Sequence, residues 1–320
     1  MFERLWREQG VDAVLRQLVQ GRRFGFDPER VAFALALQRL SPVAGSDLQG
    51  AAWLRTVECA GFADLELWHL YRTVGWLAQV REQFERSLFL RDRDLFTQTL
   101  DLVFIDTTST FVYRREPTEL RRRGYSRDRR PECPQVVICL AVDRHGWPIA
   151  WDLLPGNTAD PVALAAMIKK LRQRLPIGRI TVVADRGMIS RDSIALLEGH
   201  AQAPFDFILG CRLRQHKEVT EEVLARAGRW HKVQGNLEVK QVLVGPRRYI
   251  VCSNPLEAKK DAAARQAILA KLEQALAHGP KAVVGNVGFK RFLRIDRGAV
   301  RIDRDAVQRD ARLDGKFVLR

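Results

Sequence analysis

The sequence predicts a mixed α/β fold in which a sheet is covered by helices, with a helical region before it and a β-rich region after it. Three observations lead to this prediction. Residues 1–98 show the apolar period of amphipathic helices. Residues 99–212 alternate short apolar runs, typical of buried strands, with helical segments. Residues 213–320 combine strand-like alternation with one long helix.

Two helices stand out in residues 1–98. Asp27 has the position of an N-cap and Pro28 that of the first helical residue, so a helix runs through residues 31–40 and ends at Ser41-Pro42. A second helix begins near Asp64, because a stripe of apolar residues follows at helical spacing. The stripe consists of Leu67, Leu70, Tyr71, Val74, Leu77, Ala78, Phe84 and Leu88. We expect a helical domain with a core of its own.

The predicted order of elements in the middle region is strand, hairpin, helix, strand, helix, strand. The predicted strands are 102–105, 136–142, 149–154, 180–184 and 205–209. A turn at 143–146 joins the second and third strands into a hairpin. Asp160 and Pro161 then open a helix as cap and first residue, and another helix follows at 190–198.

The last region is β-rich and basic. Residues 237–244 alternate between apolar and polar side chains, which predicts a strand. Gly245-Pro246 is a predicted turn, and residues 248–252 are the predicted return strand. Asn254-Pro255 opens a long helix that stops at Gly279-Pro280, and the chain finishes with the strand-like run 316–319.

Basic residues outnumber acidic ones by 53 to 38, a formal net charge of +15. Such an excess favours a polyanionic partner, because clustered cations release condensed counterions when they bind phosphate backbones. A GC-rich genome that encodes arginine in place of lysine is an alternative that composition leaves open. The five cysteines form no C-x-x-C pair, which disfavours a disulfide framework and structural zinc. With no signal segment and no membrane-spanning run, we expect a soluble cytoplasmic protein without a membrane partner.

Asp106 and Asp185 occupy equivalent places, each directly after a predicted buried strand. In open α/β sheets this edge binds ligands. Two carboxylates about 4 Å apart repel by roughly 4 kcal/mol at an effective dielectric constant of 20, and a divalent cation between them reverses that sign. Oxygen ligands suit Mg²⁺ or Mn²⁺. Each aspartate alone is readily explained as a loop cap, but the pair favours a metal site.

A strongly basic segment, residues 114–130, lies between the two aspartates and holds eight arginines against three acidic residues. Guanidinium groups match phosphate oxygens in bidentate fashion, and the rings of Tyr113 and Tyr125 can stack on bases. A solvated loop is the alternative. Because the segment follows the strand of Asp106, we expect phosphate contact. The residues expected to bind are Arg114, Arg115, Arg121, Arg122, Arg123, Tyr125, Arg127, Arg129 and Arg130.

Other chemistries lack their residues. The chain has no G-x-x-x-x-G-K-[ST] motif, which disfavours a nucleotide-hydrolysing motor. Ser109 and Ser126 have no histidine nearby and no nucleophile elbow, which disfavours a hydrolase triad.

Four segments together resemble bacterial insertion-sequence DDE transposases of the cut-and-paste type, in the branch with a β-rich insertion before the final glutamate. They are Val103-Phe104-Ile105-Asp106-Thr107-Thr108-Ser109, Arg123-Gly124-Tyr125-Ser126, Pro155-Gly156-Asn157-Thr158-Ala159-Asp160 and Val182-Val183-Ala184-Asp185-Arg186-Gly187-Met188. The resemblance implies an RNase H-like core over residues 99–212, a helical N-terminal domain over 1–98 and an insertion over 213–320. It also implies double-stranded DNA as partner, with transposon ends and target, and leaves a homodimer open.

The same resemblance implies two divalent ions, Mg²⁺ or Mn²⁺, held by Asp, Asp and Glu, with Asp106 and Asp185 as the first two acids. The reaction that the resemblance implies is an in-line attack on a phosphodiester, first by water and then by a DNA 3′-hydroxyl. The third acid of the family lies on a helix after the insertion, which this chain does not reach, so no glutamate is assigned. We therefore expect a truncated chain, inactive or impaired as a transposase, with apolar sheet surface exposed. The alternative is a non-catalytic DNA-binding remnant that interferes with an intact transposase. A stand-alone nuclease would need a complete acidic triad.

Overall fold

The structure is a computed structural model that describes all residues except 43–44, 92–100, 115, 175–179, 199–204, 212, 215–216, 280–282, 284–286 and 297–298. The chain divides into two compact units. The first consists of Met1–Asp101, Leu140–Asp152 and Met167–Gly178, and the second of Leu102–Cys139, Leu153–Ala166 and Arg179–Arg320. The predicted boundaries near 98 and 212 fall outside the described residues, so the three-domain division stays a prediction.

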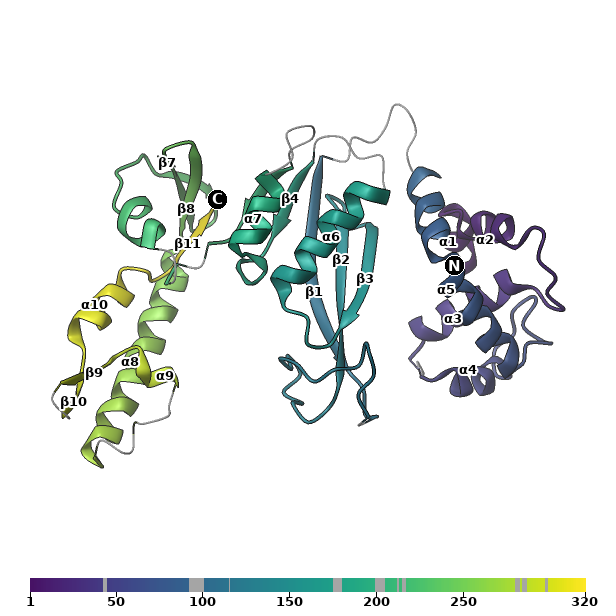
Figure 1. Ribbon diagram of the computed structural model, residues 1–320, viewed down its shortest axis with the longest axis horizontal. Coiled ribbons are helices and arrows are strands. Elements are labelled where there is room, and N and C mark those ends of the chain that lie inside the picture. The colour runs from purple at the N-terminus through teal and green to yellow at the C-terminus, as the bar shows by residue number, and fades with distance from the viewer. Residues whose placement is uncertain are drawn as a thin grey trace. The chain divides into compact units, whose positions relative to one another are not determined.

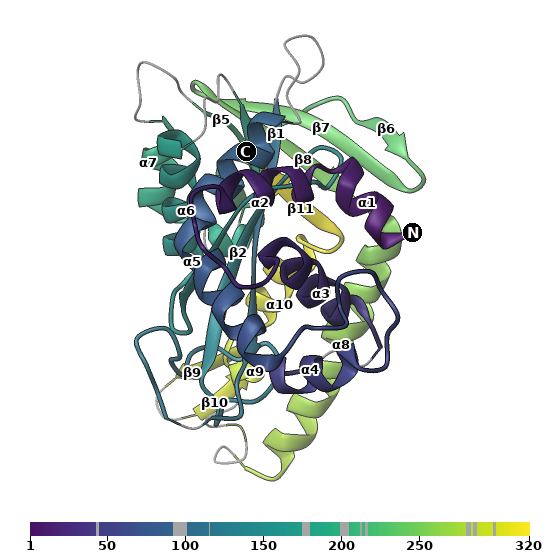
Figure 2. The same cartoon turned by 90° about the vertical axis from the view of Figure 1, so that its right-hand side faces the viewer.

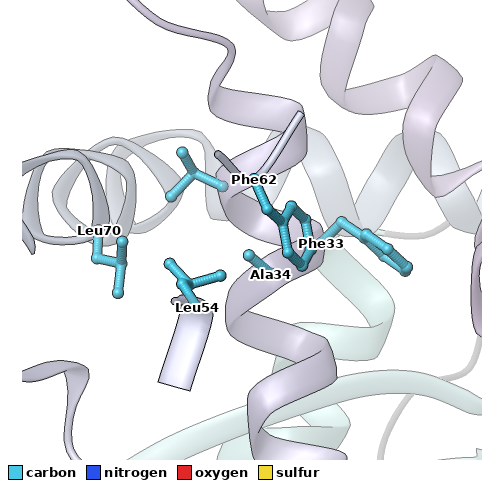
Figure 3. Close-up of a cluster of buried hydrophobic side chains, with 6 residues drawn as sticks. Phe33, Ala34, Leu54, Phe62 and Leu70 are labelled. Atoms are coloured by element: carbon cyan, nitrogen blue, oxygen red, sulfur yellow. The ribbon is translucent and has the colours of Figure 1, made fainter. Parts of the chain in front are cut away.

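The first unit contains five helices within the described part of residues 1–91 (Figure 1). They are α1 (Phe2–Glu8), α2 (Val11–Val19), α3 (Pro28–Leu40), α4 (Asp47–Leu54) and α5 (Leu67–Arg91). The predicted cap of α3 is confirmed, because the Asp27 carboxylate accepts hydrogen bonds from the backbone N–H groups of Glu29 and Arg30 at 2.9 and 3.4 Å. Phe33, Ala34, Leu54, Phe62 and Leu70 form a buried cluster between these helices (Figure 3).

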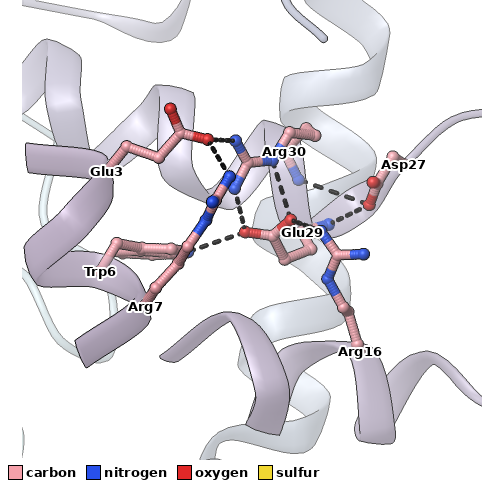
Figure 4. Close-up of polar contacts among 7 residues, drawn as sticks. All are labelled: Glu3, Trp6, Arg7, Arg16, Asp27, Glu29 and Arg30. Carbon is pink, nitrogen blue, oxygen red and sulfur yellow. Dashed lines mark hydrogen bonds and ion pairs between the residues drawn. The ribbon is translucent and has the colours of Figure 1, made fainter. Parts of the chain in front are cut away.

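A buried ion-pair network ties α1 and α2 to α3 (Figure 4). The Glu29 side chain is fully buried and accepts hydrogen bonds from Trp6 at 2.8 Å, from Arg30 at 2.7 Å and from Arg16 at 3.0 Å. Arg30 also pairs with Glu3 at 2.9 Å. Burial raises the pKa of Glu29, but the hydrogen bonds from Arg30 and Trp6 and the nearby positive charges outweigh burial and leave that pKa below its ordinary value.

The central sheet has five strands in the order β3-β2-β1-β4-β5. Its strands are β1 (Leu102–Phe111), β2 (Gln135–Asp143), β3 (Pro148–Pro155), β4 (Thr181–Ala184) and β5 (Asp206–Leu209). β1 pairs in parallel with β4, and β4 with β5. The Asp143 N–H donates to the Trp147 carbonyl at 2.9 Å and closes the predicted β2–β3 hairpin. This order agrees with the RNase H-like arrangement, so the predicted fold class is confirmed.

Helices α6 (Asp160–Arg174) and α7 (Arg191–Glu198) lie on one face of this sheet (Figure 1). The buried side chains of β1, at Val103, Ile105 and Thr107, belong to that face. On the opposite face, Phe104 and Ile208 are 40 % and 38 % exposed.

One local prediction about β1 was wrong. The predicted strand stopped at residue 105, but β1 continues to Phe111, so Asp106 lies inside a strand. The run of threonines after Asp106 has high β-propensity, and β1 has β2 as its neighbour on the other side, so the strand outlasts its pairing with β4.

The C-terminal part of the second unit contains a second sheet, in the order β11-β8-β7-β6. Its strands are β6 (His231–Gln234), β7 (Leu237–Val244), β8 (Arg247–Ser253) and β11 (Lys316–Leu319), preceded by a short π-helix, Val219–Val223. β11 also pairs with the segment that follows β5, since Gly210 forms an antiparallel bridge with Leu319 and the Cys211 N–H donates to the Val318 carbonyl at 2.7 Å. The strands predicted at residues 237–244, 248–252 and 316–319 are confirmed.

The long helix predicted after Asn254 is also confirmed as α8, Pro255–Ala277 (Figure 2). The Asn254 side chain caps it by accepting from the N–H groups of Leu256 and Glu257. α9 (Val287–Lys290), β9 (Leu293–Asp296), β10 (Ala299–Ile302) and α10 (Arg304–Ala311) follow. α10, capped by Asp303, was not predicted. Within the described ranges, no helix combines the length and apolarity that membrane crossing requires.

Candidate functional site

The register of β1 and β4 brings Asp106 and Asp185 to neighbouring positions. The last paired residues are Ile105 and Ala184, and the two aspartates are the next residue on each strand. Asp185 keeps an extended backbone, with φ −71° and ψ 159°. Because adjacent strands lie about 5 Å apart and paired residues of parallel strands face the same side, both carboxylates lie on the side of Phe104. Both aspartates are exposed.

A third carboxylate, that of Asp160, lies at the same edge. A Cβ on Gly187 would lie 3.4 Å from Oδ2 of Asp160 and 3.9 Å from Oδ2 of Asp185, so the two side chains flank this glycine. The missing side chain at Gly187 leaves room for both acids. Asp160 is the first residue of α6, where a negative charge is favoured by the helix dipole.

Asp160 is already paired with a residue of the basic segment. Arg127 Nη2 donates to Oδ1 and Oδ2 of Asp160 at 3.1 and 3.2 Å and to Oγ1 of Thr107 at 2.9 Å. Thr107 Oγ1 in turn donates to Oδ1 of Asp160 at 2.8 Å, and the Thr107 carbonyl accepts from Arg127 Nη1. The charge of Asp160 is therefore compensated within the protein.

Two glycines of the resemblance motifs fix the base of the basic segment. A Cβ on Gly124 would lie 2.1 Å from the Gly156 carbonyl oxygen, and a Cβ on Gly156 would lie 2.0 Å from the Gln135 carbonyl oxygen. Only residues without side chains allow this approach of backbone to backbone. The Gln135 side-chain amide donates to the carbonyls of Tyr125 at 3.0 Å and Gly156 at 2.8 Å. The segment thus leaves and rejoins the sheet beside β1.

Most arginines of this segment extend from the fixed base into solvent. Arg121 donates to Thr118, and Arg130 lies 3.7 Å from Glu132. Tyr113 and Tyr125 are 77 % and 87 % exposed. Four further arginines are exposed and have no acidic partner among the described residues: Arg114, Arg122, Arg123 and Arg129. Arg115 lies outside the described residues.

The metal chemistry of the site depends on its donor set. Asp106 and Asp185 offer carboxylate oxygens of the type that Mg²⁺ and Mn²⁺ prefer, so the pair fits part of a divalent-cation site. In the part of the chain that the structure describes, no three His, Cys, Asp or Glu side chains gather in a way that could hold a metal ion. The residues present therefore offer two carboxylates at this edge, and a third ligand is unassigned.

The contacts that Thr107, Gln135 and Asp160 make at this edge were not predicted. Each was visible in the sequence only as part of a resemblance motif or of a strand, and their contacts join residues up to 53 positions apart. Asp160 was interpreted as a helix cap, although its proximity to the same sheet edge was considered.

The strand order and the two adjacent aspartates define an RNase H-like protein with a carboxylate pair at one edge of its sheet. Residues 98–267, just over half of the chain, match the family model described as "Transposase DDE domain". The chain belongs to this family. A search of curated proteins found no match.

Among solved structures, the chain is similar to the piggyBac transposase in a synaptic complex with hairpin DNA, with 14 % identity over 76 % of this chain and 57 % of that one and a TM-score of 0.39. It is also similar to the Mos1 transposase in a paired-end complex with the left transposon end, with 18 % identity over 59 % of this chain and 61 % of that one and a TM-score of 0.23. The third similar structure is the Drosophila P element transposase in a strand transfer complex, with 18 % identity over 65 % of this chain and 46 % of that one and a TM-score of 0.30. The chain thus spans less than two thirds of each of these proteins.

Proposed function

We propose that the chain is a DNA transposase of the insertion-sequence type, in which Asp106 and Asp185 bind divalent cations and the basic segment binds the DNA backbone. The observation that carries this proposal is the parallel register of β1 and β4, which makes the two aspartates neighbours at one sheet edge. Membership of the DDE transposase family supports the same reaction class.

The charge distribution supports a polyanionic partner for the part of the chain outside the N-terminal helices. Residues 1–91 hold 12 arginines and 11 acidic residues, a balance of +1, so +14 of the total of +15 lies in residues 92–320. In that part, the exposed arginines of the segment 114–130 start from a base fixed beside β1. Phosphate groups bound there would lie close to Asp106 and Asp185.

In this proposal the protein contributes mainly position and charge. The guanidinium groups hold the DNA phosphates, and β1 and β4 fix the spacing of the two carboxylates. A pair of Mg²⁺ or Mn²⁺ ions bound by these carboxylates would activate the attacking oxygen and stabilise the leaving one. A third carboxylate is part of the proposed ligand set and is not assigned. A homodimer, which the resemblance leaves open, stays a prediction.

The test is strand cleavage of DNA that carries transposon ends, with Mg²⁺ or Mn²⁺ present. Asp106→Asn and Asp185→Asn are each expected to lower metal-dependent cleavage about 100-fold or more, because each removes a ligand charge. Asp192→Asn is the matched control, since Asp192 is an exposed acid in the first turn of α7. Cleavage that both site variants retain would contradict the proposal.

A second candidate is a non-catalytic DNA binder that interferes with an intact transposase. The incomplete carboxylate set among the described residues favours it. It predicts no cleavage by the unaltered chain, together with DNA binding that weakens steeply with salt and survives Asp106→Ala. Binding that ignores salt would remove this candidate.

A further inference from the structure

The carboxylate of Asp160 connects three segments that are far apart in the sequence. It accepts hydrogen bonds from Thr107 on β1, 53 residues away, and from Arg127 in the basic segment, 33 residues away. Thr107 is only 4 % exposed, so this arrangement has one buried and fixed partner. Arg127 is held at three different oxygen atoms or groups: the Asp160 carboxylate, the Thr107 hydroxyl and the Thr107 carbonyl.

A helix cap does not account for these contacts. A capping carboxylate accepts from the N–H groups of its own helix, as Asp27 does for α3. The hydrogen bonds that the structure gives to the Asp160 side chain go instead to Thr107 and Arg127, both outside α6. Their combined effect is to attach the basic segment to the strand residue that directly follows Asp106.

We propose that Asp160 is a positioning residue that, together with Thr107, holds Arg127 and thereby orients the basic segment beside Asp106 and Asp185. This proposal rests on the proposed function, and it adds a residue that acts through Arg127 rather than on the reacting phosphate. The segment is fixed at its base by Gly124 and Gln135. The contact of Asp160 with Arg127 is a second attachment point further along the segment, and two attachment points define a direction where one does not.

The orientation has a direct consequence for DNA. The neighbouring arginines carry enough charge to bind phosphate without Asp160. Loss of the Asp160 contact therefore leaves the affinity for DNA unchanged or slightly tighter, because a negative charge is removed. The reaction at saturating DNA becomes slower, because bound phosphates are held less accurately relative to the two aspartates.

Limited trypsin digestion of the free, full-length protein tests the attachment without any need for activity. The segment contains many arginines, and trypsin cleaves after arginine. Asp160→Asn and Thr107→Val are each expected to speed cleavage within residues 121–130 about five- to tenfold, the effect of losing partly exposed charge-assisted hydrogen bonds. The Asp192→Asn control should digest at the original rate. A variant counts as folded if its unfolding temperature lies within about 2 °C of that of the original protein. If Asp160→Asn does not fold, Thr107→Val alone provides the test.

A double-mutant cycle and cleavage kinetics complete the test. If Asp160 acts through Arg127, Asp160→Asn combined with Arg127→Gln is no more protease-sensitive than the more affected single variant. In the DNA assay, Asp160→Asn should lower kcat about tenfold with KM unchanged or lower. Protease sensitivity equal to that of Asp192→Asn, additive effects in the cycle, or a higher KM with unchanged kcat would each overturn the proposal. If the original protein cleaves no DNA, the proposed function fails while the digestion result still decides the role of Asp160.

Discussion

Replacement of Glu29 by glutamine should destabilise the N-terminal helices more than any surface change of equal size. The Glu29 side chain is fully buried, and its partners Arg30 and Arg16 are 10 % and 61 % exposed. The substitution keeps the volume but removes the buried one of the two carboxylate charges that pair with Arg30. Removing one partner of a buried pair costs about 3–5 kcal/mol. Because Arg16 can turn to water and Arg30 keeps Glu3, we expect a value near the lower end, about 3 kcal/mol.

Hydrogen exchange of the α3 amides measures this cost in the intact chain, without assuming that the whole protein unfolds in one step. A loss of about 3 kcal/mol corresponds to about 100-fold faster exchange of the slowest α3 amides. Glu8→Gln is the matched control, since Glu8 pairs with Arg4 on the surface, where both side chains are more than half exposed, and such pairs contribute about 0–1 kcal/mol. Equal exchange rates in Glu29→Gln and Glu8→Gln would refute the argument from burial.

The same carboxylate gives the pH dependence a definite sign. The pKa of Glu29 is lower in the folded protein than in the unfolded chain, where it is near 4.5. Its contribution is therefore fully present above pH 4.5 and is lost as the pH falls through the lower, folded value. Protection of α3 should thus be constant from pH 7 to about 5 and decline below that in the original protein. The decline should be smaller in Glu29→Gln.

Two further predictions concern the basic segment. Gly124→Ala would place a Cβ 2.1 Å from a backbone oxygen. Overpacking of this kind costs about 2–3 kcal/mol, so the variant should unfold at a temperature several degrees lower. The control is Gly75→Ala in α5, where no atom lies within 4 Å of the new Cβ, and this change should stabilise the protein by about 0.5–1 kcal/mol. A reversed order of the two unfolding temperatures would contradict the close approach of Gly124 and Gly156. The double variant Arg122→Gln/Arg123→Gln should reduce the slope of log K against log[salt] in DNA binding by about 2, since each phosphate contact contributes about 0.9; an unchanged slope would show that these two arginines do not contact phosphate.

The parts of the fold that sequence reasoning predicted correctly are those governed by local chemistry. Asp27 and Asn254 cap their helices through backbone groups two or three residues away, and such contacts are encoded in a short window. The strands around residues 103 and 182 were recognised from short continuous apolar runs, and both are interior strands of the sheet, with a neighbouring strand on each side. The adjacency of Asp106 and Asp185 follows once these strands pair in parallel.

The parts that were missed depend on contacts distant in sequence or on short elements. Nothing near Asp160 in the sequence indicates Arg127 as its partner, because that contact exists only after β1, α6 and the basic segment have come together. β1 extends past Asp106 because β2 supports it where β4 does not. α10 is eight residues long and lacks a continuous apolar stripe. The third metal ligand and the expected truncation stay predictions.

Localised cleavage by bound iron tests the central claim most directly. Fe²⁺ bound in place of Mg²⁺ reduces added hydrogen peroxide to hydroxide and a hydroxyl radical, with ascorbate returning Fe³⁺ to Fe²⁺, and the radicals cut the backbone next to the metal. We predict cuts near residue 106 and near residue 185 in the same sample, both suppressed by excess Mg²⁺ and both lost in Asp106→Asn. Cuts near only one of the two residues, or cuts at 185 that persist in Asp106→Asn, would show that these carboxylates do not share a cation.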